Sequence, residues 1–327
     1  MCTSILYKNG SISYFGRNLD LQYAMGTKVT VAPRNMPLKF RNGEVIENHP
    51  AMVGMSITPD EEFPLFFEAF NEYGVGIAQL HFQNMAVYQK EVKEGTIGLA
   101  SFEMIAYLLS KCRSVAELKE ELKHITVLDT AFSEQYPPAP LHWMMADKEQ
   151  SIVVEPLEDG LSVHDNIVNV MTNCPEYPAQ YFNFCNYMGV TGKYPTNRIA
   201  PQLDLACYST AMGSFGLPGG VDSASRFVRA GFTLNNAIAK ETDEDTLTQC
   251  FHIMQSVAQS NGTNQTEDKL YEITQYTVAC NLGTMDFYWT TYNNNQINGL
   301  HTRKLDLDAN TLYEFEVSEK QAVHFVK

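Results

Sequence analysis

The order of strand-like and helix-like segments constrains the fold of this chain more than any other feature of its sequence. Alternating apolar residues, rich in β-branched and aromatic side chains, predict a first block of strands that ends at Phe82. Helical periodicity follows, and then a second block of strands, a second pair of helices and closing strands. Because no repeat of about 20–50 residues and no low-complexity linker interrupts this order, we predict one α+β domain over residues 1–327.

The individual elements follow from local patterns. The predicted strands are residues 3–7, 11–17, 28–33, 51–57, 64–70, 74–82, 151–158, 161–165, 167–173, 271–280 and 285–292. The predicted helices are residues 101–112, a segment starting at Ser114 with Glu117 in a capping box, 223–239 and 243–259. The Gly/Pro-rich stretch 213–220 is predicted to be an irregular loop, because it lacks the lysine and the spacing of a phosphate-binding loop.

The first two strands flank Asn9-Gly10, a strong hairpin signal. If these are the two turn residues, Cys2 lies opposite Arg17 on the same face, with Asp20 just beyond. A nearby guanidinium lowers the pKa of a thiol, and a carboxylate can hold an ammonium group. On this geometry alone, an ordinary strand with surface charges explains the pattern equally well, and a one-residue bulge would change the register.

The position of Cys2, directly after the initiator methionine, suggests a catalytic use. If Met1 is removed, the new α-amino group titrates near ~7.7–8.0 and the thiol near ~8.5, so the amine can accept the thiol proton. This is the chemistry of N-terminal nucleophile hydrolases, and it needs no catalytic histidine. No GxSxG or HExxH motif offers a rival site.

Composition excludes several other classes. With 23 Lys plus Arg against 38 Asp plus Glu, the net charge is −15, so nucleic acid is not an expected partner. The seven cysteines are scattered and include no CxxC pair, which argues against a disulfide framework and a metal site. We interpret the six cysteines other than Cys2 as small buried residues in a reducing cytoplasm. We identify no secretory signal and no apolar run near the ~20 residues of a membrane span. We expect a cytoplasmic protein without cofactor.

A specific resemblance adds to these patterns. The chain contains, in order, MCTSI, YFGRNLD, VAPRN, NEYGVGIAQLHF, FSEQYPPAPLHWMMADKEQSIVVEP, VMTNCP, GLPGGVDSASRFVR and TQYT. Together these stretches resemble the choloylglycine hydrolase family, which contains bile salt hydrolases and penicillin V acylases. The resemblance runs from Met1 to about residue 300. It implies the four-layer αββα sandwich of N-terminal nucleophile hydrolases, assembled as a homotetramer.

The resemblance also implies the roles of site residues. Cys2 would be the nucleophile, Arg17 would tune its thiol and Asp20 would hold the new α-amino group. The side-chain amide of Asn173 and the backbone N–H of residue 81 would form the oxyanion hole, and Arg226 would complete the charged site. From residue patterns alone, Asn173 reads as a strand-end turn residue and Arg226 as a solvated helix charge.

The sequence departs from the family pattern at three positions. Position 81 is His, where bile salt hydrolases typically have Asn and penicillin acylases Tyr; Gln79 and Gly220 replace an expected Gly and Asp. A backbone N–H survives any of these changes, so we expect His81 to alter the shape of the pocket and not the chemistry. We interpret His142 as a core histidine.

Three functions compete at this stage. The first is an amidase that cleaves glycine- or taurine-conjugated bile salts through an acyl-enzyme on Cys2. The second hydrolyses the phenoxyacetyl amide of penicillin V with the same chemistry. The third is a non-catalytic binder of amphipathic small molecules on the same fold, against which the complete set of site residues argues. The stretch at 132–156 is closer to the bile salt branch.

Overall fold

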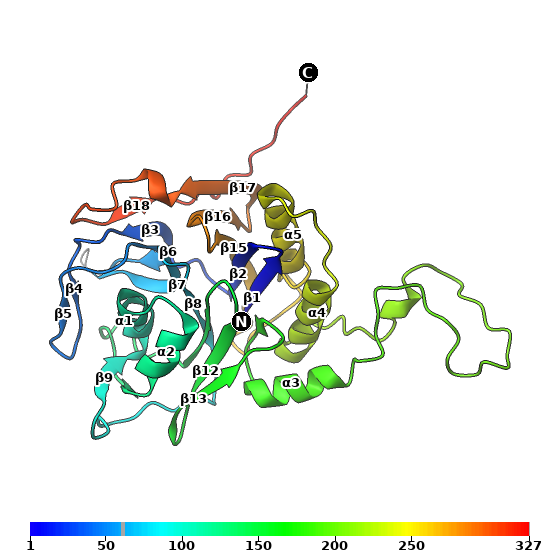
Figure 1. Cartoon of the computed structure of the whole chain (residues 1–327), viewed down its shortest axis with the longest axis horizontal. Coiled ribbons are helices and arrows are strands. Elements are labelled where there is room, and N and C mark those ends of the chain that lie inside the picture. The colour runs from blue at the N-terminus through cyan, green and yellow to red at the C-terminus, as the bar shows by residue number, and fades with distance from the viewer. Residues whose placement is uncertain (60–62, 327) are drawn as a thin grey trace.

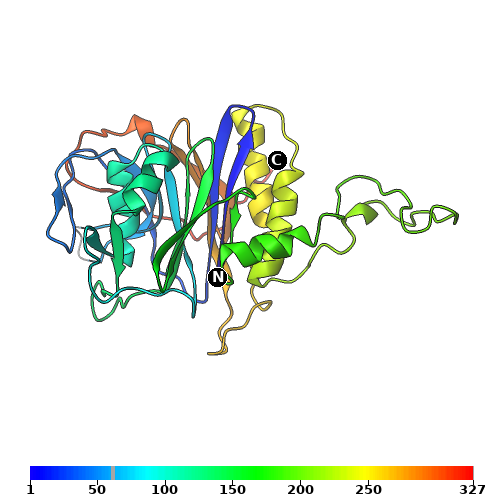
Figure 2. The same ribbon diagram turned by 60° about the horizontal axis from the view of Figure 1, so that its bottom comes forward.

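The structure, a computed structural model, describes residues 1–59 and 63–326 of the chain. Two large, mostly antiparallel β-sheets pack face to face, and helices cover the outer face of each, as Figure 2 shows edge-on. The predicted α+β class and the four-layer αββα sandwich are confirmed.

The first sheet carries the N-terminus on a strand next to its edge. Its six strands run in the order β14-β1-β2-β15-β16-β17. Their bounds are β1 Cys2–Asn9, β2 Ile12–Leu21, β14 Val170–Met171, β15 Ile273–Asn281, β16 Asp286–Thr291 and β17 Asn294–His301. Because β1 and β2 have neighbours on both sides, Cys2 is fixed within the sheet and is 3% exposed.

The second sheet has eight strands in the order β13-β12-β11-β8-β7-β6-β3-β18. Their bounds are β3 Lys28–Ala32, β6 Met52–Ile57, β7 Leu65–Asn71, β8 Gly76–His81, β11 Leu141–Ala146, β12 Ser151–Leu157, β13 Gly160–Asp165 and β18 Tyr313–Phe315. Its central strands are apolar on both faces: in β8, Ala78 and Leu80 pack into the core between the sheets, while Ile77 packs under the outer helices. A sheet with both faces covered needs such continuous apolar strands.

Helices close the sandwich on both sides (Figure 1). On the eight-stranded sheet lie α1 Met104–Lys111 and α2 Val115–Leu122, and on the six-stranded sheet lie α3 Tyr177–Cys185, α4 Ser223–Asn235 and α5 Asp243–Gln255. The minor elements are the strand pairs β4 Leu38–Lys39 with β5 Val45–Ile46 and β9 Ile97–Ala100 with β10 Ile125–Leu128, and the 3-10 turns η1 Ser101–Glu103, η2 Met212–Ser214 and η3 Thr302–Lys304. As predicted, Ser114 caps α2: its hydroxyl accepts from the backbone N–H of Glu117.

The predicted register of the first hairpin is wrong by one pair. Asn9 pairs with Ile12, so Gly10 and Ser11 are the turn residues and Cys2 lies opposite Leu19 instead of Arg17. Gly10, at the first central position, has φ 60°, which favours glycine. Contacts with the rest of the chain fix this register, because Glu241 accepts from Ser11 N–H and Asn9 donates to Lys240 O.

The shift by two residues keeps Cys2 and Arg17 on one face of the sheet, because side chains alternate with a period of two. That face looks toward the second sheet, since Arg17 contacts Glu68 of β7. Asp20 lies on the opposite face, which α4 and α5 cover, together with Thr3 and Asn18. Asp20, predicted to lie just beyond Arg17, is therefore on the other face of the hairpin from the Cys2 thiol.

Most predicted elements are present; β1 and β2 are longer than predicted, and most of the others are shorter at their ends. The last two predicted helices end at Asn235 and Gln255, and the predicted strand 167–173 is reduced to β14. The helix α3 and the strands β11 and β17 lie outside the predictions. Within residues 1–59 and 63–326, no helix is long and apolar enough to cross a membrane.

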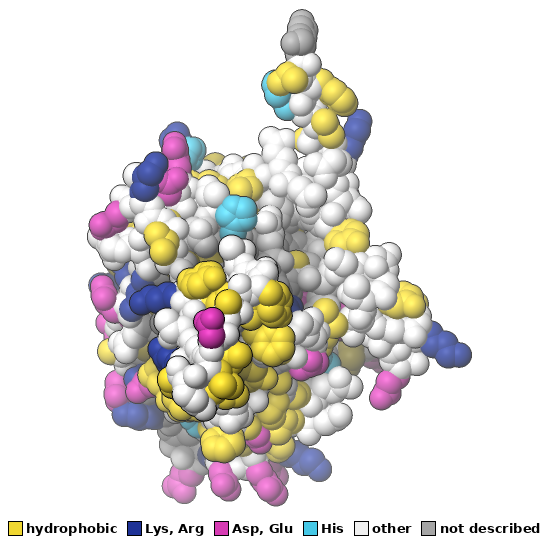
Figure 3. Space-filling model, turned by 90° about the vertical axis from the view of Figure 1, so that its right-hand side faces the viewer, with side chains coloured by type: hydrophobic (Ala, Val, Ile, Leu, Met, Phe, Trp, Pro, Cys, Tyr) yellow, Lys and Arg dark blue, Asp and Glu magenta, His cyan; other side chains and the backbone are white. Residues whose placement is uncertain are grey.

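A long arm between α3 and α4 projects from the sandwich on the side of the six-stranded sheet (Figures 1 and 2). It includes the predicted loop 213–220, which is irregular apart from η2. Apolar side chains gather on it (Figure 3), and its exposed members include Tyr194, Ile199, Leu203, Leu205, Tyr208 and Phe215.

Candidate active site

The thiol of Cys2 lies against the guanidinium of Arg17. Arg17 Nη2 is 3.3 Å from Cys2 Sγ and donates also to the backbone oxygen of Gln79 at 3.1 Å. Both residues are buried. The guanidinium of Arg17 is therefore the cation in contact with the sulfur.

Arg17 is held on its other side by two buried groups. Its Nη1 donates to Glu68 Oε2 at 2.6 Å and to Tyr276 Oη at 2.7 Å, and Tyr276 in turn donates to Glu68 Oε2 at 3.0 Å. Burial would lower the pKa of Arg17, but Tyr276, Cys2 and Glu68 raise it above its ordinary value. The guanidinium is therefore a fixed positive charge beside the thiol.

Asn173 joins the backbone of Cys2 to the end of β8. Its Oδ1 accepts from Cys2 N at 2.9 Å and from Arg226 Nη2 at 2.7 Å, and its Nδ2 donates to the backbone oxygen of His81 at 2.7 Å. The two groups at Oδ1 can only donate and the carbonyl can only accept, so the orientation of the amide is fixed. Nδ2 carries a second hydrogen that the carbonyl of His81 does not use.

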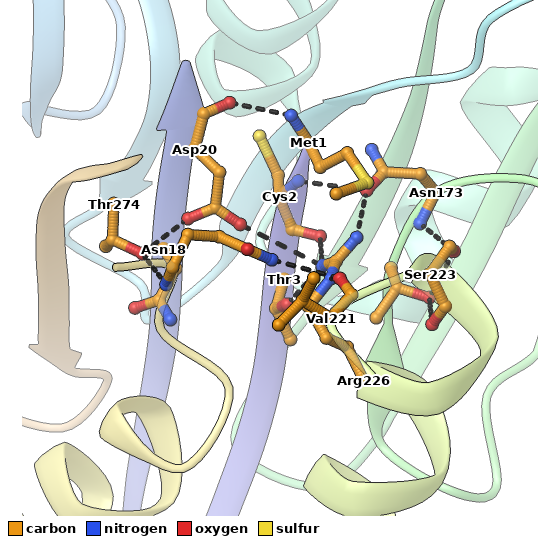
Figure 4. A network of polar contacts seen from close by, with 12 residues as sticks. Met1, Cys2, Thr3, Asn18, Asp20, Asn173, Val221, Ser223, Arg226 and Thr274 are labelled. Atoms are coloured by element: carbon orange, nitrogen blue, oxygen red, sulfur yellow. Dashed lines mark hydrogen bonds and ion pairs between the residues drawn. The ribbon is translucent and has the colours of Figure 1, made fainter. Parts of the chain in front are cut away.

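Arg226 fixes this side of the site from α4 (Figure 4). Besides Asn173, its guanidinium donates to the backbone oxygen of Cys2, to Thr3 Oγ1 at 2.7 Å and to Val221 O at 2.9 Å. Burial lowers the pKa of Arg226, and the nearby Asp20 and Cys2 oppose that change.

The carboxylate of Asp20 has fewer hydrogen bonds than the side chains of Asn173 and Arg226. Thr274 donates to its Oδ1 at 2.6 Å, and Arg226 Nη1 lies 4.0 Å from its Oδ2. Among the described residues, Oδ2 has no hydrogen-bond partner. Burial raises the pKa of Asp20, and the cations Arg226 and the terminal ammonium oppose this rise. This carboxylate therefore has room for one more donor.

Residues Thr274 and Tyr276 reach the two faces through a bulge. Thr274 pairs with Asp20 and Tyr276 pairs with Leu19, so the register of β15 against β2 shifts between them. In a regular strand, residues two apart share a face. The bulge sends Thr274 to Asp20 on the helix-covered face and Tyr276 to Arg17 between the sheets.

The terminal residue occupies a defined place as well. The ammonium of Met1 donates to the backbone oxygen of Asp20 at 2.7 Å and to Glu272 Oε1 at 2.9 Å. Asp20 N–H donates back to Met1 O at 2.9 Å, which extends the β1–β2 ladder. The start of the chain is therefore anchored beside Cys2.

His81 ends β8 with a half-buried side chain. Phe82 N–H donates to Pro140 O on the β11 side. Successive residues of a strand direct their backbone groups to opposite sides, so the N–H of His81 points with its carbonyl toward Asn173. Burial lowers the pKa of the His81 imidazole, helped by the terminal ammonium. The ring is therefore neutral near pH 7.

The remaining sequence candidates lie at the edges of the site. His142 is buried, stacks on Phe82 with ring centroids 4.4 Å apart and bonds Thr172 O through Nε2, so it supports β8 and β14. A Cβ on Gly220 would lie 2.6 Å from Asp222 Oδ2, the cap of α4, so glycine fits here. Within the described ranges, no group of three His, Cys, Asp or Glu could hold a metal ion.

All of the residues proposed from the sequence meet around Cys2, but sequence reasoning missed four of their partners: Glu68, Ser223, Thr274 and Tyr276. Ser223 Oγ accepts from the backbone N–H of Asn173 at 2.9 Å. Thr274 and Tyr276 lie within the TQYT stretch, and Glu68 is an acidic residue inside an apolar strand. A charge in such a strand is a usable signal, because a buried carboxylate requires a partner.

Comparison with known proteins agrees with this geometry. Residues 2–315 match the family model described as linear amide C–N hydrolases, choloylglycine hydrolase family. The chain is 40% identical over 323 residues to a bile salt hydrolase/transferase of Lactiplantibacillus plantarum, covering 98% of each chain. It is 32% identical over 330 residues to the bile salt hydrolase/transferase of Clostridium perfringens, covering all of both.

Solved structures show the same relationship. A mutant of the conjugated bile acid hydrolase from Clostridium perfringens superimposes with a TM-score of 0.92 at 31% identity over 100% of both chains. Penicillin V acylase from Agrobacterium tumefaciens gives a TM-score of 0.76 at 19% identity over 96% of this chain and 91% of that one, which shows a shared fold. From its fold, its site and these matches, the chain belongs to the choloylglycine hydrolase family of linear amide C–N hydrolases.

Proposed function

We propose that the protein hydrolyses the amide bond of glycine- or taurine-conjugated bile salts, with Cys2 as the nucleophile after removal of Met1. The observation that carries the proposal is the arrangement around Cys2: Arg17 contacts its thiol while Asn173 holds its backbone nitrogen and the end of β8. The names of the relatives at 32–40% identity supply the substrate class.

The new α-amino group of Cys2 would act as the base. It keeps Asn173 Oδ1 as a partner, and the free Oδ2 of Asp20 is the proposed acceptor for the additional hydrogens of this amine. The amine takes the thiol proton, and the thiolate attacks the amide carbon. The same amine then returns the proton to the departing glycine or taurine nitrogen.

The oxyanion would lie between Asn173 Nδ2 and the backbone N–H of His81. Asn173 Nδ2 lies on the side of β8 toward which the backbone N–H of His81 points. The bond from Arg226 to Asn173 Oδ1 prevents the amide from rotating. Preorganised donors of this kind stabilise the tetrahedral intermediate without reorganisation. Water would then release the bile acid from the thioester by the same steps in reverse order.

A transferase activity is a second candidate, because two relatives carry "hydrolase/transferase" in their names. The thioester on Cys2 can be attacked by an amine as well as by water. Water gives the free bile acid, and an amine gives a new bile acid amide. Incubation of a conjugated bile salt with a second amino acid, followed by mass spectrometry, tests this: a new conjugate supports it, and free bile acid alone contradicts it.

The assembly proposed is a homotetramer in the cytoplasm. The exposed apolar side chains of the arm support an oligomer, since so large a patch is unusual on a monomer. All seven cysteines, which lie within the described residues, are unpaired, as expected in a reducing compartment. Light scattering on the intact protein and on an Ile199→Asp/Leu203→Asp variant tests the assembly, and an unchanged mass would contradict the role of the arm.

A parallel assay tests the proposed substrate. Taurocholate, glycocholate and penicillin V are supplied to purified protein whose N-terminus is read by mass spectrometry. We expect Met1 to be absent, bile salts to be cleaved faster than penicillin V, and Cys2→Ala to be inactive while Cys185→Ala retains activity. Cys2→Ser should be nearly inactive, because a hydroxyl is much harder to deprotonate.

Each alternative has its own signature in this assay. Full activity from chains that retain Met1 would exclude the α-amino base. Faster cleavage of penicillin V would favour the acylase, and a chain that binds bile salts without turnover would be the non-catalytic binder.

A further inference from the structure

Glu68 is a fully buried carboxylate that the proposed mechanism leaves without a role. It lies on β7, in the sheet opposite Cys2, and accepts from Arg17, from Tyr276 and from the backbone N–H of Met55. It does not contact the thiol; Arg17 lies between them, with Nη1 on Glu68 and Nη2 on Sγ. Burial of a carboxylate carries a desolvation penalty in free energy, so we expect Glu68 to have a role that its position explains.

We propose that Glu68 is a positioning residue that holds Arg17 against Cys2 and, by sharing the charge of the guanidinium, limits how strongly Arg17 acidifies the thiol. The inference rests on the proposed role of Cys2 as nucleophile.

The charges around Arg17 support this division. Between the sheets, the guanidinium faces Glu68, the hydroxyl of Tyr276, the backbone oxygen of Gln79, the ring of Phe67 and the thiol. The other charged pair, Asp20 with Arg226, lies on the opposite face of the hairpin. With Glu68 ionised, Arg17 is already paired when the thiol is neutral. Without that negative charge, the thiolate would be the nearest anion to a buried cation.

Titration of Glu68 would then be linked to the thiol. Burial raises the pKa of Glu68 to about 7, and Arg17 and Tyr276 oppose the rise. Each negative group weakens the other's ionisation, so a protonated Glu68 favours the thiolate. A very acidic thiol is a weaker nucleophile, because nucleophilicity falls with pKa. An ionised Glu68 thus opposes the ionisation of the thiol and preserves the nucleophilicity of its sulfur.

The test is the pH dependence of the reaction between Cys2 and iodoacetamide, followed by peptide mass spectrometry on protein lacking Met1. Glu68→Gln keeps the size and removes the charge, and we expect its profile to move about one pH unit lower. Tyr276→Phe removes a hydrogen bond that stabilises ionised Glu68, so its profile should move in the same direction by less. Glu103→Gln is the control: this buried carboxylate accepts from the backbone of Arg41 and Ala100, away from Cys2.

The outcomes separate cleanly. The proposal is supported if the alkylation profiles of Glu68→Gln and Tyr276→Phe move to lower pH while the profile of Glu103→Gln stays in place. Folding of the two variants is judged by circular dichroism. If a folded variant shows an unchanged alkylation profile, or one shifted to higher pH, the proposal is overturned. No substrate is involved, so a failure to cleave bile salts leaves this result standing, whereas a Cys2 that does not react in the parent protein overturns both proposals.

Discussion

The two faces of the β1–β2 hairpin carry two guanidinium–carboxylate pairs that differ in how tightly they are closed. Between the sheets, Arg17 and Glu68 are 2.6 Å apart and share a tyrosine hydroxyl. On the helix-covered face, Arg226 and Asp20 are 4.0 Å apart and one carboxylate oxygen is unbonded within the described residues. Arg17 of the closed pair contacts the thiol of Cys2, and Arg226 of the open pair contacts the backbone oxygen of Cys2.

This difference suggests a division of labour. The face between the sheets would set the charge of the thiol, which needs a fixed positive charge beside it. The helix-covered face would hold groups whose bonding changes, namely the α-amine and, through Asn173, the oxyanion. A buried polar atom without a partner is costly, so its presence at Asp20 fits a place for a donor that arrives with processing.

The largest effect should come from the helix-covered face. Asn173→Ala removes the only side-chain donor proposed for the oxyanion, so kcat should fall by roughly 10²–10³, with a smaller change in KM. Steady-state kinetics on a conjugated bile salt measure this, with Asn295→Ala on exposed β17 as the control. A variant that changes only KM would place Asn173 in substrate binding.

Lysine substitutions should separate the two faces. A lysine keeps the charge but cannot serve several acceptors in fixed directions. Arg17→Lys and Arg226→Lys should each lower kcat by roughly 10-fold or more, as expected when a positioned group is lost. Only Arg17→Lys should also move the alkylation profile of Cys2, toward higher pH. Equal profiles for the two variants would contradict the division between thiol and backbone.

Stability should depend on pH through the closed pair. Folding raises the pKa of Glu68 from 4.5 to about 7, so between these values the folded chain binds the extra proton. Stability from this group is therefore present at low pH and is lost as the pH rises through about 7. In a Cys2→Ala background, the free energy of unfolding should fall more steeply between pH 5 and 7 with Glu68 than with Glu68→Gln. Parallel urea titrations measure it, and identical slopes would show that Glu68 titrates normally.

The smallest effect should come from His81, whose side chain belongs to neither pair. Its backbone faces Asn173, so its imidazole should border the acyl group. His81→Tyr should shift the ratio of kcat/KM values toward penicillin V by roughly 10-fold, and His81→Asn should shift it away. Neither should alter the alkylation profile. If the ratio stays the same in both variants, position 81 does not select the acyl group.

The sequence predicted one face of the hairpin better than the other. Cys2 and Arg17 share a face in either register, because the error was two residues, so their contact was predictable from alternation. Asp20 was predicted to lie just beyond Arg17 without an assigned face, and its side chain lies on the helix-covered face with Thr274 and Arg226. The approach of Asn173 and Arg226, 171 and 224 residues away from Cys2, came only from resemblance to known proteins.

The partners that were missed have a physical explanation. Tyr276 and Thr274 look equivalent in a regular strand, and only the bulge in β15 separates their faces. Glu68 comes from the other sheet, and nothing local in PLFFEAF specifies which strand it meets. The order of the strands and the stacking of the two sheets depend on packing of the whole core. Contacts between the sheets therefore cannot be predicted from local sequence periodicity.

The alternation of the hairpin also limits how it can change during evolution. Deleting one residue between the turn and Arg17 would turn the guanidinium toward α5, away from the thiol, unless a bulge compensated. Deleting two residues would move it by one pair and leave it on the thiol's face. Related proteins aligned over this hairpin should therefore differ in length mainly by even numbers of residues.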